Sequence, residues 1–104
     1  MLRVFISSSS GNTMMRGRQQ YVLNLLSSLQ IPFETCDVSS SKELKTFLVD
    51  SLNENQKPIT FPQLFLGDQY IGGYEEFLTA NETETLSDFL HVDIDRTPVS
   101  FGAS

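Results

Sequence analysis

The fold is decided by the stretch Thr60-Phe61-Pro62-Gln63-Leu64-Phe65-Leu66-Gly67-Asp68-Gln69-Tyr70-Ile71-Gly72-Gly73. Pro62 can open a strand, and residues 63–66 after it have the composition of a buried one. Gly67-Asp68 supplies a tight turn, and residues 69–71 form the second arm of a hairpin. The stretch therefore predicts a β-hairpin, which leads through a pair of glycines into a helix that begins at Tyr74.

The chain before this hairpin has the pattern of strand, helix, strand and helix. Apolar residues at helical spacing follow Asn12 or Thr13, and Ser40 stands three residues ahead of Glu43, which is the spacing of a capping box. The predicted elements are a strand at 2–6, a helix from 12 or 13 to about 30, a strand at 33–38 and a helix ending near 52. After the hairpin, Leu86, Phe89 and Leu90 share one face of a last short helix.

This order predicts the fold class. A parallel strand–helix–strand unit has a right-handed crossover, and the hairpin adds at the edge of its sheet. The result is an α/β, thioredoxin-like fold with a four-stranded mixed sheet in β-α-β-α-β-β-α order and an additional C-terminal helix. Because the chain has 104 residues, we expect one domain over residues 1–92, with a flexible tail at 93–104.

Composition excludes several classes of function. Seven Lys and Arg against thirteen Asp and Glu give a net charge of −6, so no nucleic acid partner is expected. No apolar run approaches the length of a membrane span, and the N-terminus lacks a secretory signal, so we expect a cytoplasmic protein that binds no membrane. One Cys and one His predict neither a disulfide framework nor a metal site. We expect a monomer.

Residues 60–77 resemble the glutaredoxin segment in which Thr-x-Pro is followed by a hairpin, a Gly-Gly pair and an acidic helix start. Over residues 2–92 the chain is similar to the SH3-domain-binding glutamic-acid-rich-like proteins, a cytoplasmic, glutaredoxin-like branch. The features that carry this wider similarity are the opening strand and serines, Gln19-Gln20, the Pro-x-Leu-Phe hairpin and residues 86–90. The resemblance implies the glutaredoxin-like fold and a cis peptide bond between Phe61 and Pro62.

The sequence departs from this family in two places. Three residues separate Pro58 from Pro62, whereas a PxxP ligand of an SH3 domain needs two, so that motif is absent. The C-terminus also carries no glutamate-rich tail.

The loop where a glutaredoxin holds its reactive cysteine contains none here. Residues 7–13 are Ser7, Ser8, Ser9, Ser10, Gly11, Asn12 and Thr13. A serine hydroxyl does not ionise near neutral pH, and the only histidine, His91, is too far along the chain to predict a base beside it. Cys36 lies in a predicted strand, where a core position is expected and a redox-sensing thiol is the alternative. We therefore expect no catalytic residues and no enzyme activity.

The resemblance does imply the scaffold of a glutathione groove. In that scaffold the backbone of Phe61 would meet the cysteinyl part of glutathione, and the N–H groups of Tyr74 and Glu75 would receive its γ-glutamyl carboxylate. The alternative is that the fold alone requires the Thr60–Pro62 turn and the Gly-Gly pair. We expect no cofactor, with weak binding of glutathione as the other possibility. Arg16 and Arg18 could partner an anion, although a solvated face is the expected role.

We expect a non-catalytic protein that works through a protein partner. The alternative is a glutathione-binding redox regulator or a weak glutathione-dependent thiol oxidoreductase. The predicted binding surface, occupied by a peptide or partner loop, is the groove bounded by Ser8, Ser9, Ser10, Gly11, Asn12, Phe61, Pro62, Gly73, Tyr74 and Glu75. From residue 58 to residue 95 the chain has acidic side chains and no Lys or Arg. That half predicts either a basic partner or a solvated acidic surface.

Overall fold

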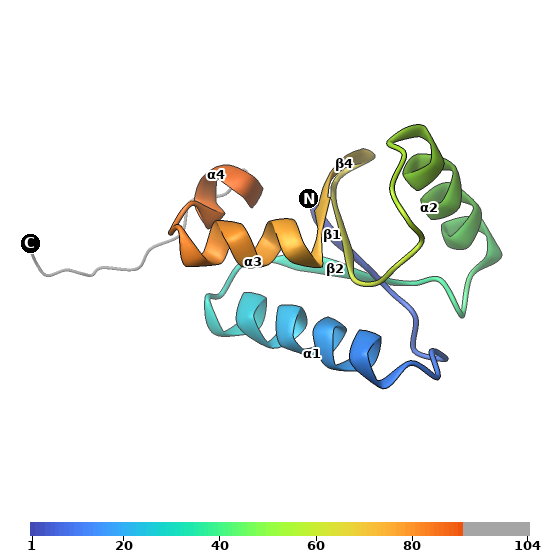
Figure 1. The fold of residues 1–104 in the computed structure, drawn as a ribbon, viewed down its shortest axis with the longest axis horizontal. Coiled ribbons are helices and arrows are strands. Elements are labelled where there is room, and N and C mark those ends of the chain that lie inside the picture. The colour runs from blue at the N-terminus through green and yellow to red at the C-terminus, as the bar shows by residue number, and fades with distance from the viewer. Residues whose placement is uncertain (91–104) are drawn as a thin grey trace, which may run out of the picture.

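The structure, a computed structural model, describes residues 1–90, so the predicted tail at 93–104 and His91 lie outside the described residues. The order of elements is the predicted one (Figure 1). The elements are β1 (Leu2–Ile6), α1 (Thr13–Ser28), β2 (Phe33–Asp37), α2 (Lys42–Glu54), β3 (Gln63–Leu66), β4 (Gln69–Gly73), α3 (Tyr74–Glu82) and α4 (Leu86–Leu90).

The four strands form one mixed sheet in the order β2-β1-β3-β4. β1 pairs in parallel with β2, with Val4 opposite Thr35, and antiparallel with β3, with Val4 opposite Leu64. β4 lies at the edge and pairs with β3 across an irregularity between Leu64 and Phe65. The thioredoxin-like topology with the hairpin at one edge is therefore confirmed.

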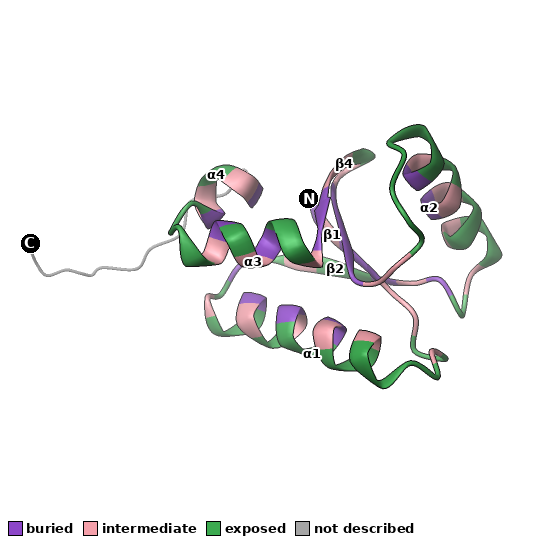
Figure 2. Cartoon of the chain, viewed as in Figure 1, coloured by how far each residue is buried: buried purple, intermediate pink, exposed green. Residues whose placement is uncertain are grey.

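The helices cover both faces of the sheet, as Figure 1 shows, and each face has its own core. On one face Val22 and Leu26 of α1 pack with Phe77 of α3 and the strand residues Val4 and Leu64. These helix positions are buried while the opposite sides of the helices are exposed (Figure 2).

The second core lies under α2. Leu48 and Leu52 of α2 pack there with Phe5, Phe65 and Cys36 from the strands. Cys36 is only 3% exposed, which confirms its predicted place in the core. Burial of these apolar side chains is the main favourable contribution to folding.

Some predicted boundaries are wrong. Ser41, not Ser40, caps α2, because its hydroxyl accepts the N–H of Leu44 at 3.3 Å, so the predicted capping box is absent. α1 ends at Ser28, and Gln30 adopts a left-handed φ of 59° that a helix cannot continue. α2 runs on to Glu54 because nothing before Asn55 stops it.

Among the helices of residues 1–90, none combines the length and the apolar character needed to cross a bilayer.

Candidate functional site

Phe61 lies between two hollows on the surface, and its peptide bond to Pro62 is cis, as predicted. The first, which we call the Tyr74 hollow, has a volume of about 290 Å³, and its walls include Arg18, Lys57, Phe61, Gly73, Tyr74 and Glu75. The second, which we call the Ile59 hollow, is of similar size, and its walls include Ser9, Lys45, Leu48, Ile59 and Phe61. Phe61 is the one residue that lines both hollows, so the predicted groove corresponds to two hollows and not to one.

The Tyr74 hollow combines aromatic and cationic side chains. The Arg18 guanidinium lies 4.7 Å from the centre of the Tyr74 ring, within the range of a cation–π contact. The Tyr21 ring meets the same ring edge-on, with 6.3 Å between centroids. Arg18 is half-buried and lies over this ring, whereas Arg16 is exposed.

A buried amide forms part of the wall of the Tyr74 hollow. The side chain of Gln63 donates through Nε2 to the carbonyl oxygen and to the hydroxyl of Thr60, both at 3.0 Å. Its other atom, Oε1, is buried and has no hydrogen-bond partner among the described residues. A Cβ placed on Gly73 would come within 3.0 Å of this oxygen, so the glycine leaves room for the amide.

The N-terminus of α3 opens into the same hollow. The backbone N–H of Gly73 donates to a carboxylate oxygen of Glu76 at 2.7 Å and is therefore occupied. The N–H groups of Tyr74 and Glu75 lie in the first turn, where a helix provides no carbonyl partner for them.

Tyr70 also lines the Tyr74 hollow. Burial, together with the nearby Glu76 carboxylate, raises the pKa of Tyr70 to about 12, so its hydroxyl stays protonated at neutral pH.

The serine loop before α1 uses its polar groups to hold its own shape. The Ser7 N–H donates to the buried Gln19 side chain at 2.8 Å, and the Asn12 side chain caps α1 by accepting the N–H of Met15. The Ser8 N–H donates to Asp37 at 3.2 Å. These contacts support a structural role for the loop.

Asp37 anchors that loop to the turn after β2. Partial burial raises the pKa of Asp37, but hydrogen bonds from Ser39 and Ser8 outweigh it and lower the pKa to about 2. The Ser39 hydroxyl donates to the carboxylate at 2.6 Å and lies 2.9 Å from the Ser8 hydroxyl. The carboxylate therefore acts as an acceptor that joins two loops.

The structure brings together only part of the predicted site. Phe61, Gly73, Tyr74 and Glu75 share the Tyr74 hollow. Ser9 lines the Ile59 hollow instead. The remaining predicted residues line neither hollow: Ser8, Ser10, Gly11, Asn12 and Pro62.

Sequence reasoning missed several polar residues of the two hollows, among them Lys45, Lys57 and Gln63. Gln63 had a detectable signal, because it is a polar residue at the head of the otherwise apolar run Leu64-Phe65-Leu66. Lys45 and Lys57 had no such signal in the sequence. Lys45 lies on α2 and Lys57 lies in a loop, and only the tertiary fold brings them beside Phe61.

Among the described residues, neither hollow is lined by a cysteine. Cys36, the one cysteine of the chain, is buried in β2 under α2. Within residues 1–90 no group of three His, Cys, Asp or Glu side chains is placed to hold a metal ion.

Comparison with known proteins gives concordant results. The model of the family described as "SH3-binding, glutamic acid-rich protein" matches residues 1–93. The chain is 37% identical to the SH3 domain-binding glutamic acid-rich protein homolog of Drosophila melanogaster, over 96% of this chain and 70% of that protein.

Solved structures give the same fold. The actin interacting protein Aip5 of C. albicans superposes with a TM-score of 0.69 and 27% identity, over 86% of each chain. The buckwheat glutaredoxin in its glutathione complex has a TM-score of 0.67 at 20% identity, over 86% of this chain and 76% of that one. The fold is therefore that of a glutaredoxin.

Proposed function

The chain belongs to the family of SH3-binding, glutamic acid-rich proteins, and on that basis we propose that it works by binding a partner protein and not by thiol chemistry. The Tyr74 hollow carries the proposal. It keeps an aromatic ring, two cationic side chains and a helix N-terminus, while the loop at residues 7–13 holds no cysteine.

The lack of a cysteine in that loop removes the glutaredoxin reaction at its first step. Thiol–disulfide exchange begins with attack by a thiolate, and a helix N-terminus or a nearby cation can only activate a thiol that is present. Cys36 is 3% exposed and lies beneath α2, so its sulfur has no path to a disulfide in solution without opening of the core. Binding without turnover is the role that fits these residues.

The chemistry of the Tyr74 hollow favours an extended segment that carries an acidic group. The Tyr74 ring, fixed between Tyr21 and Arg18, can pack against an apolar side chain. Arg18, Lys57 and the free N–H groups at the start of α3 favour a carboxylate. Phe61 then forms the ridge over which the segment passes toward the Ile59 hollow.

The names of two relatives support a protein as the partner. One is named for binding SH3 domains and the other for interacting with actin. In this chain Pro58 and Pro62 have the wrong spacing for a PxxP ligand, so contact with an SH3 domain would need another surface.

Glutathione is a second candidate for the same hollow. Its carboxylates match Arg18, Lys57 and the N–H groups of Tyr74 and Glu75. Titration with reduced glutathione, followed by amide chemical shifts, separates the candidates. Saturable shifts at Phe61 and Tyr74 would favour glutathione, and reduction of a mixed glutathione disulfide that is lost in Cys36→Ser would contradict a non-catalytic role.

The experiment on partner binding uses Tyr74 as the anchor. A partner is isolated by pull-down with the full chain, and its affinity is compared for Tyr74→Ala, Tyr74→Phe and the double variant Glu82→Lys/Glu84→Lys. Loss of a buried aromatic anchor costs more than about 1 to 2 kcal/mol, so we expect at least about a tenfold loss for Tyr74→Ala. Tyr74→Phe keeps the ring and should retain most of the affinity.

The charge-reversal variant tests whether the acidic side of the molecule is the real site. Glu82 and Glu84 are exposed and line neither hollow beside Phe61, so their reversal should change the affinity little. If it abolishes binding while Tyr74→Ala leaves it unchanged, with both variants folded by circular dichroism, the Tyr74 hollow is not the binding site.

A further inference from the structure

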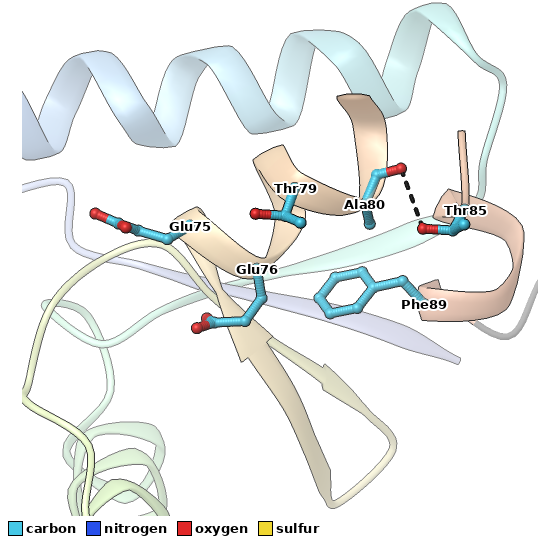
Figure 3. Close-up of a pocket in the computed structure, with 6 residues that line it drawn as sticks. All are labelled: Glu75, Glu76, Thr79, Ala80, Thr85 and Phe89. Atoms are coloured by element: carbon cyan, nitrogen blue, oxygen red, sulfur yellow. Dashed lines mark hydrogen bonds between the residues drawn. The ribbon is translucent and has the colours of Figure 1, made fainter. Parts of the chain in front are cut away.

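A third hollow lies between α3 and α4, next to the Tyr74 hollow. It has a volume of about 500 Å³ and is lined by Glu75, Glu76, Thr79, Ala80, Thr85 and Phe89 (Figure 3). We call it the Phe89 hollow. It shares only Glu75 and Glu76 with the Tyr74 hollow.

An aromatic ring and a methyl group provide the apolar surface of the Phe89 hollow. Figure 3 shows the Phe89 ring reaching from α4 toward Glu76 and Ala80 of α3. The ring is held from behind by Gly72, where an added Cβ would lie 2.9 Å from its Cζ atom. The absence of a side chain at Gly72 thus leaves room for the ring.

The carboxylates of the hollow have oxygen atoms that lack a hydrogen-bond donor among the described residues. The Thr85 hydroxyl is already used, because it donates to the Ala80 carbonyl at 3.4 Å and lies 2.9 Å from the Thr83 hydroxyl. One oxygen of Glu76 accepts the Gly73 N–H. The Glu75 carboxylate makes no hydrogen bond or ion pair with any residue of the described part, where both ion pairs involve Arg3.

Within residues 58–90 no cation is present to neutralise these carboxylates. Between residues 58 and 90 every charged side chain is acidic. The acidic residues nearest in sequence extend the negative charge beyond the hollow: Glu82, Glu84 and Asp88. An apolar floor beside carboxylates that form no ion pair in the described part of the chain is complementary to a side chain with an apolar stem and a cationic end.

We propose that the Phe89 hollow binds an arginine side chain from a basic segment of a partner protein. The stem of the arginine packs on Ala80, its planar guanidinium stacks on the Phe89 ring, and its N–H groups donate to the second oxygen of Glu76, while the Glu75 carboxylate adds negative charge at the rim of the hollow. Arginine fits better than lysine, because only its planar group can stack and form paired hydrogen bonds at once.

The test is titration of the full chain with the blocked peptide acetyl-Gly-Gly-Arg-Gly-Gly-amide, followed by amide chemical shifts. We expect saturable shifts at Thr79, Ala80 and Thr85, weakened by added salt as for any partly exposed ion pair. The same peptide with citrulline, which keeps the shape and loses the charge, should bind at least about fivefold more weakly. Equal binding of the citrulline peptide would overturn the proposal.

Two matched pairs of variants locate the site. Thr79→Lys places a cation in the hollow and should abolish the shifts, whereas Ser27→Lys makes the same charge change on α1 and should not. Glu75→Gln should weaken binding several-fold, whereas Glu82→Gln, also on α3 but outside the hollow, should not.

Equal effects within either pair would assign the response to general surface charge and overturn the proposal. Sedimentation of the free chain tests whether a second copy of the chain occupies the hollow instead. A dimer that Thr79→Lys dissociates would assign the hollow to a second copy and would likewise overturn it.

Discussion

The Tyr74 hollow and the Phe89 hollow adjoin along the first turn of α3, yet they differ in charge. Arg18 and Lys57 line the first, whereas the second has carboxylates and no cation. Glu75 and Glu76 belong to both. The difference arises because α1 and the loop before β3 reach only one side of α3, so one helix start serves two surfaces of different chemistry.

Adjacent glycines support the two hollows separately. Gly72 has a φ of 153°, and a Cβ there would lie 2.9 Å from both the Glu76 Cβ and the Phe89 ring. Gly73 has an ordinary φ of −110°, and its Cβ would meet the end of the Gln63 side chain at 3.0 Å. Single substitutions in this pair can therefore disturb one hollow at a time.

The largest effect is expected for Gly72→Ala. The new methyl group meets Glu76 and Phe89 at a backbone angle that favours glycine, so the free energy of unfolding should fall by about 1 to 3 kcal/mol. Urea unfolding followed by circular dichroism measures this loss. Binding of the arginine peptide should also be lost, because the Phe89 ring must move. Unchanged stability would show that the ring is not held by Gly72.

A smaller effect is expected for Gly73→Ala. The backbone is not strained, and the side chain that it meets is the flexible end of Gln63, so the cost should be about 1 kcal/mol or less. The displaced amide should weaken partner binding at the Tyr74 hollow more than binding of the arginine peptide. The affinities of the folded variant for the partner and for the arginine peptide test this expectation. A larger loss for the arginine peptide than for the partner would contradict the claim that the two glycines support the two hollows separately.

Most of the fold could be predicted from the sequence, because local patterns and topology rules agree. The stretch from Thr60 to Gly73 specifies a hairpin, and the apolar spacing before it specifies a parallel unit, which leaves few ways to build the sheet. The errors are at helix ends. Ser40 and Ser41 offer the same hydroxyl one residue apart, and sequence spacing alone does not decide which one caps the helix.

The candidate site was less predictable, because it depends on side chains that are distant in sequence. Phe61, Gly73 and Tyr74 follow from the hairpin segment and do meet in one hollow. The place of Arg18 over the Tyr74 ring requires the crossing of α1 past α3, which no local pattern encodes. The Phe89 hollow depends likewise on how α4 returns against Gly72, a contact 17 residues apart in the chain.

The smallest effect concerns how a carboxylate is held on each side of the molecule. The carboxylate of Glu75 in the Phe89 hollow makes no hydrogen bond within residues 1–90, whereas that of Asp37 beside the serine loop accepts hydrogen bonds from Ser8 and Ser39. Partial burial raises the pKa of Asp37, but these hydrogen bonds outweigh it and lower the pKa from 3.8 to about 2. A pKa lowered by folding gives stability that is present above pH 3.8 and is lost as the pH falls through about 2.

Because Asp37 is only half-buried and solvent screens its interactions, this contribution should be only about 0.5 kcal/mol. It should disappear in Asp37→Asn, with Asp50→Asn as a control on the exposed surface of α2. Amide spectra recorded between pH 5 and pH 2, a range that brackets the two pKa values, should show the signals of Ser8 and Ser39 moving together near the lower pH, before α3 is affected. If these signals move near pH 4 instead, the carboxylate does not join the two loops, and the serine loop beside the Ile59 hollow is held by Gln19 alone.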